Sequence, residues 1–398
     1  MGEYPPVGDI HWWSVGGPVY GPTVDQDSRG TARIDPRARI DRHKKNDPDS
    51  RAESDTGADC SAQAAQTGQN VQTGRAASTE GTVRSERAEA PGGALIRARG
   101  LVKRFGDFTA VDGIDVEVAP GESFGFLGPN GAGKSSTMRM IACVSPPSEG
   151  ELTILGRDPR RDGPAIRARL GVVPQRDTLD EELTVRENIF TYGRYFGLPR
   201  ALLRERTEEL LEFTHLTERG DDKVEPLSGG MKRRLTIARS LINEPEILLL
   251  DEPTTGLDPQ ARHVLWDRLF RLKRQGVTLV LTTHYMDEAE QLCDRLVVMD
   301  GGRIVAEGSP QALIETWSTR EVLELRYSVD DHTTLVPGLE GLADRIEALP
   351  DRILMYTDDG DAAAAAMLAR DPAPVSFLVR RSTLEDVFLR LTGRTLVD

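Results

Sequence analysis

The sequence predicts an α/β domain with a mainly parallel sheet, and three observations support this prediction. Between residues 94 and 308, short apolar runs of strand length alternate with stretches of helical periodicity. A glycine-rich loop at 128–136 directly follows the apolar run 123–127. Two later apolar runs, 247–250 and 277–283, are followed directly by acidic residues and by a histidine, which are side chains that can take part in catalysis.

The composition limits the classes of protein to consider. The chain has 398 residues, enough for two or three domains, and its net charge of −14 argues against a nucleic-acid partner. Three scattered cysteines show neither metal spacing nor a disulfide framework, as expected in a reducing cytosol. Without a signal peptide or an apolar run near the ~20 residues of a membrane span, we expect a soluble chain that reaches a membrane only through a partner.

Residues 1–93 are predicted to form a disordered, low-complexity tail. They are rich in Gly, Ser, Thr, Asp, Arg, Ala and Gln and show no sustained periodicity. The aromatic residues near the start could form a docking motif, but a solvated tail is the preferred interpretation. A second alternative is that the tail is not translated: no methionine lies between Met1 and Met138, and translation could start at a valine such as Val83.

The predicted domain begins near Ala94 with alternating apolar residues, which are typical of strands, at 95–99 and 111–118. Phe105 falls on a predicted loop between these strands. An aromatic ring at this place could stack on a purine base, and packing in the core is the competing interpretation.

The loop Gly128–Ser136 fits the pattern G-x-x-x-x-G-K-[ST], whose backbone N–H groups wrap the phosphates of a nucleotide. Lys134 supplies positive charge to the β- and γ-phosphates, and the Ser135 hydroxyl is placed to bind Mg²⁺. A helix predicted over 136–144 would direct its N-terminus at the phosphates, which argues against a plain glycine-rich turn. The predicted nucleotide-binding residues of this loop are Gly128, Pro129, Asn130, Gly131, Ala132, Gly133, Lys134, Ser135 and Ser136.

A strand at 150–156 and a short strand that ends on Gln175 follow this helix. Gln175 by itself supports no prediction, since an isolated glutamine is usually a solvated loop residue. Two segments of helical apolar spacing, 186–196 and 202–211, then predict a small helical block.

A Ser228-Gly229-Gly230 turn opens a basic helix predicted over 232–239. Free N–H groups and the positive end of the helix dipole make such a turn an anion site. The basic residues could also suggest nucleic acid, but a solvated face or charge placed near phosphate is the preferred interpretation.

The strand 247–250 ends on Asp251 and Glu252, at the edge of a parallel sheet where ligands bind. Asp251 would hold Mg²⁺ through water, and Glu252 is placed to polarise an attacking water. The strand 277–283 ends at His284, which can contact a γ-phosphate at such an edge, although a lone histidine is more often structural.

A hairpin around Asp300-Gly301 closes the domain, and residues 309–398 predict a small α+β appendage. A dimer-stabilising or packing role is preferred for this appendage over cargo binding. Its predicted strands and helices are 323–329, 353–357 and 376–380, and 362–368 and 384–391.

Taken together, residues 95–308 resemble the ATP-binding subunits of ABC transporters, because these motifs occur in the order that the family requires. The resemblance implies a P-loop NTPase with a RecA-like core, an antiparallel β subdomain and a helical subdomain, which uses ATP and Mg²⁺ and hydrolyses ATP. It implies that ATP is held by Phe105, which stacks on adenine, and by the Walker A loop Gly128–Ser136. Gln175 would sense Mg²⁺, Asp251 would be the Walker B acid, and Glu252 the catalytic base. Ser228–Gly230 would belong to the signature, Asp258 would be the D-loop acid, and His284 the switch histidine.

The sequence departs from the family pattern at two positions and points to one branch. Phe105 stands where tyrosine is more common, and Met231 ends the signature in place of glutamine; neither change removes a catalytic group. The segments 184–188, 227–235 and 282–294 resemble the exporter branch, with nodulation-type lipo-oligosaccharide exporters nearer than daunorubicin-resistance exporters.

The resemblance also implies partners. In the family, the signature of one subunit closes over ATP held by another, so we expect a homodimer on the cytoplasmic face of the cell membrane, bound peripherally to a separately encoded integral membrane permease. The cargo is expected to be lipid-like, an oligosaccharide or a drug. The alternative is a soluble ABC-type ATPase that regulates a non-transport machine such as the ribosome.

Overall fold

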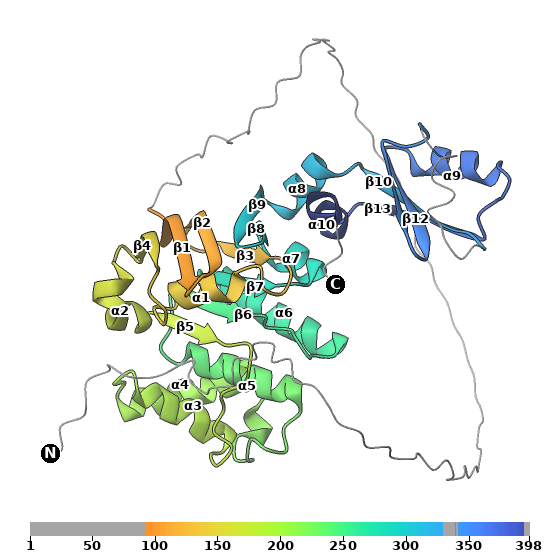
Figure 1. The fold of residues 1–398 in the computed structure, drawn as a ribbon. Helices are drawn as coiled ribbons and strands as arrows, with labels where there is room; N and C mark the ends of the chain where they lie inside the picture. The colour runs from red at the N-terminus through yellow and green to blue at the C-terminus, as the bar shows by residue number, and fades with distance from the viewer. Residues whose placement is uncertain (1–92, 329–338, 340, 394–398) are drawn as a thin grey trace, which may run out of the picture. The chain divides into compact units, whose positions relative to one another are not determined.

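The structure of the protein is a computed structural model that describes residues 93–328, 339 and 341–393 (Figure 1). The predicted tail therefore lies outside the described residues apart from Gly93, and so does Val329, the last residue of a predicted strand.

A six-stranded sheet forms the centre of the larger domain, and the predicted α/β class is confirmed (Figure 1). All its neighbouring strands run parallel except the last pair, which is antiparallel. In sheet order the strands are β5 (Leu170–Val173), β6 (Ile247–Asp251), β7 (Thr278–Thr283), β3 (Ser123–Leu127), β8 (Arg295–Asp300) and β9 (Arg303–Gly308).

The central strands are continuously apolar because both faces of the sheet are covered. Leu249 of β6 packs in a core that includes Met138 of α1 (Lys134–Ile141). Its neighbour Leu250 points to the other core, together with Leu269 of α6 (Pro259–Arg274). Alternate side chains of one strand therefore enter opposite cores.

A three-stranded antiparallel sheet is built from strands on both sides of the glycine-rich loop in the sequence, and it corrects one expectation. Its order is β2 (Phe108–Val118), β1 (Ile96–Phe105) and β4 (Glu149–Ile154). Phe105 is the last residue of β1, paired with Phe108 across a tight turn, and does not lie on a loop between the strands. The turn contains Gly106 at φ 56°, a left-handed angle that glycine adopts without strain.

The predicted helical block is present as α3 (Val185–Arg194) and α4 (Arg200–Phe213), and α5 (Gly229–Leu241) packs against both helices (Figure 1). Their apolar residues form a core of their own. α5 begins three residues earlier than predicted because Ser228 caps it: the Ser228 hydroxyl accepts a hydrogen bond from Met231 N at 3.3 Å.

Some short helices were not predicted. In α2 (Pro159–Arg167) the pattern is obscured by Pro164, and a kink divides the helix at Asp162. The other two are α7 (Met286–Leu292) and α8 (Pro310–Trp317), and the structure also has a 3₁₀ turn, η1 (Thr217–Arg219). No described helix combines the length and the hydropathy that a membrane span requires.

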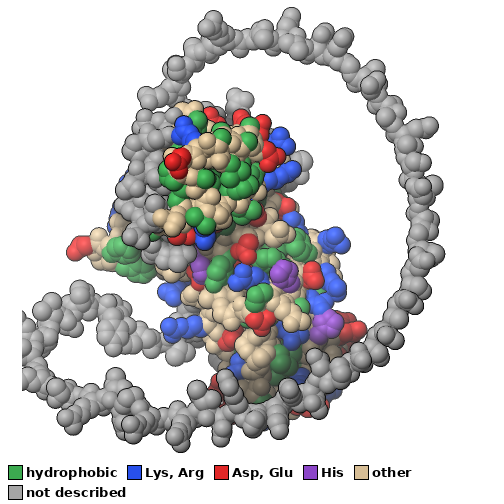
Figure 2. Space-filling model, turned by 90° about the vertical axis from the view of Figure 1, so that its right-hand side faces the viewer, with side chains coloured by type: hydrophobic (Ala, Val, Ile, Leu, Met, Phe, Trp, Pro, Cys, Tyr) green, Lys and Arg blue, Asp and Glu red, His purple; other side chains and the backbone are tan. Residues whose placement is uncertain are grey.

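The C-terminal segment forms a four-stranded antiparallel sheet with two helices. Strand β10 ends at Arg326, before the predicted end at Val329, and β11 was not predicted. The side that Figure 2 turns to the viewer carries a group of hydrophobic side chains, and the exposed apolar residues of this segment include Phe377 and Leu378. In sheet order the strands are β11 (Arg345–Leu349), β12 (Arg352–Thr357), β10 (Glu321–Arg326) and β13 (Ser376–Arg381), and the helices are α9 (Gly360–Leu368) and α10 (Leu384–Thr392).

Helix α10 joins the C-terminal sheet to the α7–α8 region. Phe388 of α10 packs in the same core as Leu292 of α7 and Leu313 of α8. Glu290 of α7 also accepts a hydrogen bond from Leu384 N at 2.7 Å. The last helix of the segment predicted as an appendage is therefore part of the core that covers the central sheet.

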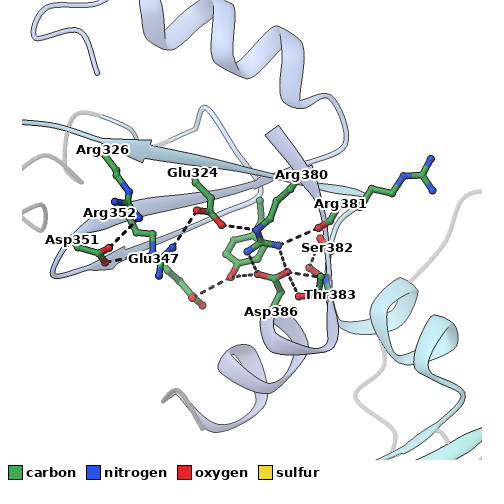
Figure 3. Close-up of polar contacts among 12 residues, drawn as sticks. Glu324, Arg326, Glu347, Asp351, Arg352, Arg380, Arg381, Ser382, Thr383 and Asp386 are labelled. Carbon is green, nitrogen blue, oxygen red and sulfur yellow. Dashed lines mark hydrogen bonds and ion pairs between the residues drawn. The ribbon is translucent and has the colours of Figure 1, made fainter. Parts of the chain in front are cut away.

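An ion pair between buried Asp386 and partly exposed Arg380 links α10 to strand β13 (Figure 3). The Asp386 carboxylate is 1% exposed and accepts hydrogen bonds from Arg380 Nη1 at 2.7 Å and Nη2 at 2.9 Å. It also accepts from Thr383 N at 2.8 Å and from the Tyr356 hydroxyl at 3.2 Å. Burial alone would raise the pKa of the Asp386 carboxyl, but the Arg380 and Thr383 hydrogen bonds hold that pKa below its usual value.

We expect Asp386→Ala to lower the free energy of unfolding at pH 7 by about 3 kcal/mol, because it removes the charge-assisted hydrogen bonds from Arg380 and the capping box of α10. Arg380 keeps its second carboxylate partner, Glu324, at 2.6 Å. A carboxyl with a lowered folded-state pKa stabilises the fold above its unfolded pKa of about 3.9, and this contribution is lost as the pH falls through the folded value. In urea unfolding, the free energies of unfolding of Asp386→Ala and the unsubstituted protein should therefore differ by a similar amount at pH 7 and pH 5. The difference should be smaller at pH 3.5.

Asp351→Ala is the matched control, since half-exposed Asp351 pairs with partly exposed arginines, Arg326 (Oδ2 to Nη2, 3.5 Å) and Arg352 (Oδ1 to Nε, 3.4 Å). Such a pair contributes at most about 1 kcal/mol. An equal loss for both variants would contradict the assignment of the pair between Asp386 and Arg380.

Candidate nucleotide-binding site

The glycine-rich loop lies between β3 and α1, and its shape requires glycine at both ends. A Cβ atom on Gly128 would lie 2.3 Å from Met299 O. At Gly133, where φ is 102°, a Cβ atom would lie 2.4 Å from Ala110 O. The close backbone packing at these two positions explains why the sequence pattern fixes them.

The Lys134 side chain is held inside the loop. It is 4% exposed, and Nζ donates hydrogen bonds to Gly128 O at 2.7 Å and Pro129 O at 3.0 Å. Burial lowers the pKa of the Lys134 ammonium group, and the charges of Glu252 and Asp251 oppose the shift. A cation therefore lies in the loop where the sequence predicts phosphate.

Asp251 ends β6 beside the first turn of α1. Its Oδ1 accepts hydrogen bonds from the Ser135 hydroxyl at 3.1 Å and the Thr282 hydroxyl at 2.5 Å. Burial raises the pKa of the Asp251 carboxyl, and these two hydrogen bonds oppose the shift. The structure thus brings together Ser135 and Asp251, two of the three residues predicted for Mg²⁺, whereas the third, Gln175, contacts Glu252.

Glu252 meets both of the other predicted catalytic residues. Gln175 Nε2 donates to Glu252 Oε2 at 2.8 Å, and His284 Nδ1 lies 3.4 Å from Oε1. The Thr255 hydroxyl donates to Oε2 at 3.2 Å, and Lys134 Nζ lies 3.9 Å from Oε1. Glu252 is therefore the point where three separate segments of the chain converge.

The environment of Glu252 favours its ionised form. The contact with His284 lowers the pKa of the Glu252 carboxyl, burial opposes the shift, and the Lys134 charge adds to the lowering. The backbone of Glu252 has φ 45°, a left-handed angle that is unusual for a side chain of this size. Strained residues that persist in this way are concentrated at functional sites.

Three other predicted residues lie at the surface. Phe105 is 49% exposed, with Lys103 Nζ 5.0 Å from the ring centroid. Ser228 is exposed at the start of α5. Asp258 caps α6, where its Oδ1 accepts from Ala261 N at 2.8 Å, and a Cβ atom on Gly230 would lie 3.1 Å from Ala261 Cβ. The signature turn and the D-loop acid therefore flank the same helix start.

Two residues of the site were not predicted. Thr282 reads as an ordinary β-branched strand residue, and Thr255 as part of a turn. Thr282 also accepts from Glu252 N, through its hydroxyl at 3.0 Å and through its carbonyl at 3.1 Å. The parallel pairing of Asp251 with Thr282 places this residue, and that register is not visible in the sequence.

Comparison with known proteins gives matches to two separate parts of the chain. A family model described as ABC transporter matches residues 111–255, and one described as the C-terminal domain of nodulation factor export protein NodI matches residues 330–393. The chain is 47% identical over 305 residues to the Nod factor export ATP-binding protein I of Cupriavidus metallidurans, covering 77% of this chain and 99% of that protein. It is 48% identical over 296 residues to the protein of the same name from Paraburkholderia xenovorans, covering 74% and 96%.

Solved structures give the same result. An ATP-binding subunit of an ABC transporter matches with 30% identity and a TM-score of 0.52, covering 56% of this chain and 92% of that one. A dimeric ATP-binding cassette in a post-hydrolysis state, bound to ADP and Pi, matches with 28% identity and a TM-score of 0.50, covering 54% and 98%.

These matches confirm the predictions of an ABC ATPase fold, of ATP as the ligand, and of an exporter-type ATP-hydrolysing subunit. They give no support to the ribosomal alternative, because the relatives reported above are named as export or transporter proteins. The chain therefore belongs to the family of ABC transporter ATP-binding subunits.

Proposed function

We propose that this chain hydrolyses ATP to power the export of a lipo-oligosaccharide or a similar amphipathic cargo through a separate integral membrane permease. The observation that supports this proposal is the 47% identity to a Nod factor export ATP-binding protein over 99% of that protein's length. The match of residues 330–393 to the C-terminal domain of a nodulation factor export protein extends the likeness beyond the ATPase domain.

ATP would bind along the glycine-rich loop, with its phosphates against the backbone N–H groups and the start of α1. Lys134 Nζ would exchange its present acceptors, Gly128 O and Pro129 O, for oxygens of the β- and γ-phosphates. The exposed ring of Phe105 is free on one side to stack on adenine.

Ser135 and Asp251 fit a Mg²⁺ ion, and Gln175 would complete the set. The Ser135 hydroxyl and the Asp251 carboxylate already lie 3.1 Å apart, and Mg²⁺ prefers oxygen ligands from one or two carboxylates together with substrate phosphates. Bound there, Mg²⁺ would neutralise part of the phosphate charge.

Glu252 would act as the general base. Its carboxylate accepts a proton from the attacking water while the water oxygen adds to the γ-phosphorus and ADP leaves. Gln175 and His284, which contact the two carboxylate oxygens of Glu252, would orient this carboxylate and the γ-phosphate. The charge that develops on the phosphoryl group would be stabilised by Lys134 and His284.

Two chains are needed for complete sites. We infer a homodimer in which Ser228–Gly230 of one chain closes over the ATP of the other, together with Asp258. The exposure of Ser228 and Gly229 at the start of α5 supports this arrangement, since an accessible helix start favours binding of an anion. Hydrolysis would remove the γ-phosphate and let the pair reopen.

We further propose the organisation of the chain and its place in the cell. Residues 94–308 would form the ATPase domain, residues 309–398 an accessory domain that stabilises the dimer or packs against it, and residues 1–93 a tail. The pair would lie peripherally on the cytoplasmic face of the membrane, where the region around Gln175 and the helical block, near residues 175–211, would transmit its movement to the permease.

A pull-down tests this proposal. Glu252→Gln protein with ATP is used to capture partners from gently solubilised membranes, and the co-purifying chains are identified by mass spectrometry. The expected result is a polytopic membrane protein that co-purifies in stoichiometric amount. Less of this protein should co-purify with Lys134→Ala. Ribosomal or DNA-associated partners without such a protein would overturn the export function.

A further inference from the structure

Arg233, on α5, connects three segments of the ATPase site. Its side chain is 5% exposed. Nε donates to Pro253 O at 2.7 Å, and Nη2 donates to Asp251 O at 3.1 Å and Glu252 O at 3.2 Å. Nη1 donates to Pro174 O. Every one of these acceptors is a backbone carbonyl.

The carbonyl acceptors of Arg233 belong to, or lie next to, residues on which the proposed hydrolysis depends. Pro174 O belongs to the residue before Gln175, and two of the other carbonyls belong to Asp251 and Glu252. Only an arginine offers this many donors in a planar fork. One guanidinium therefore fixes the backbone of the proposed base together with the backbone of its glutamine partner.

Maintaining this charge in the interior is costly. Burial lowers the pKa of the Arg233 guanidinium, and the carboxylate of Asp177 opposes the shift from a longer distance, with Nη1 to Oδ1 at 3.8 Å. An arginine buried mainly against neutral carbonyls is uncommon unless its geometry is needed. The left-handed backbone of Glu252, with φ 45°, is a conformation that persists only when its surroundings determine it.

Helix α5 also carries the signature turn at its start. Ser228 caps the helix, and Arg233 follows about 7–8 Å further along the axis, at 1.5 Å per residue. In the proposed dimer, Ser228 meets the ATP of the partner chain, whereas Glu252 acts on the ATP of its own chain. A rigid helix with these two contacts therefore spans from one ATP site to the other.

We propose that Arg233 is a positioning residue that couples the two ATP sites of the dimer. When ATP in one site engages the signature turn at the start of α5, Arg233 transmits the movement of the helix to the backbone of Glu252 and Gln175 in the other site. This inference rests on the proposed homodimer.

Arg234 provides a matched control on the same helix. It also donates to backbone carbonyls, from Nη1 to Thr214 O at 2.9 Å and to His215 O at 3.4 Å. Both of these acceptors lie in the helical block, away from the segment that carries Glu252. Arg234→Gln therefore removes a comparable arginine without touching the connection to the base.

The experiment measures ATP hydrolysis by the full chain as a function of ATP concentration, together with binding of a fluorescent ATP analogue. Coupling energies between sites typically change affinities about 5- to 150-fold, so we expect a Hill coefficient clearly above 1 for the unsubstituted protein. Arg233→Gln should lower the Hill coefficient to about 1 and kcat at least about tenfold, with analogue affinity changed less than about threefold. Arg234→Gln should keep the Hill coefficient and stay within about threefold in kcat.

Arg233→Lys decides the question if Arg233→Gln does not fold. Lysine keeps the charge but not the fork of donors, so its Hill coefficient should fall below that of the unsubstituted protein. A cooperative unsubstituted protein together with equally cooperative Arg233 variants would overturn the coupling role. A Hill coefficient of 1 in the unsubstituted protein, with Glu252→Gln remaining monomeric in ATP, would instead refute the proposed homodimer and the coupling with it.

Discussion

Glu252→Gln is expected to lower kcat for ATP hydrolysis by about 10²- to 10⁴-fold, the usual contribution of a general base. Glutamine has nearly the same shape as glutamate and can still accept a hydrogen bond from Gln175, but its amide cannot take the proton of the attacking water. ATP binding should change by less than about threefold, because the predicted phosphate contacts come from the glycine-rich loop.

The measurement is phosphate release under saturating ATP, with binding of a fluorescent ATP analogue recorded in parallel. Because the γ-phosphate would stay in place, the variant should also accumulate as a dimer with ATP in size-exclusion chromatography. Glu205→Gln, an exposed carboxylate on α4, is the control and should behave like the unsubstituted protein. Hydrolysis by Glu252→Gln at the unsubstituted rate would show that another group is the base.

The functional residues at the ends of strands could be predicted from the sequence, because each of them adjoins a recognisable apolar run. Asp251 ends β6, Glu252 follows that strand directly, and His284 follows β7. The rule that ligands bind at the carboxyl ends of parallel strands then brings the segments together without further information. Their contacts in the structure, such as Gln175 Nε2 to Glu252 Oε2 at 2.8 Å, agree with that placement.

Residues that depend on register or on tertiary packing could not be predicted. Thr282 contacts Asp251 only because β6 and β7 pair in one particular register. Arg233 looked like part of a solvated basic face, since nothing in a helical pattern shows that the chain folds four carbonyls around it. Helix α2 was missed for a local reason, because Pro164 interrupts its pattern.

Lys134→Ala is expected to weaken ATP binding by about 10²- to 10³-fold, because the site loses a charged hydrogen-bond donor to the phosphates. The fold should be little affected. Alanine leaves Gly128 O and Pro129 O without a donor, but it also removes a cation whose burial is unfavourable, and these two effects oppose each other.

The measurement is the affinity for a fluorescent ATP analogue, with thermal unfolding of the free protein recorded beside it. Lys273→Ala is the control, since Lys273 forms an ion pair with Asp294 on another part of the chain, at 2.5 Å from Nζ to Oδ1. Combining Lys134→Ala with Glu252→Gln separates the two steps further. If Lys134 acts in binding and Glu252 in hydrolysis, the double variant should not form the ATP-dependent dimer that Glu252→Gln alone accumulates, because ATP must bind before it can be trapped. A double variant that dimerises in ATP as readily as Glu252→Gln would show that Lys134 does not hold the phosphates.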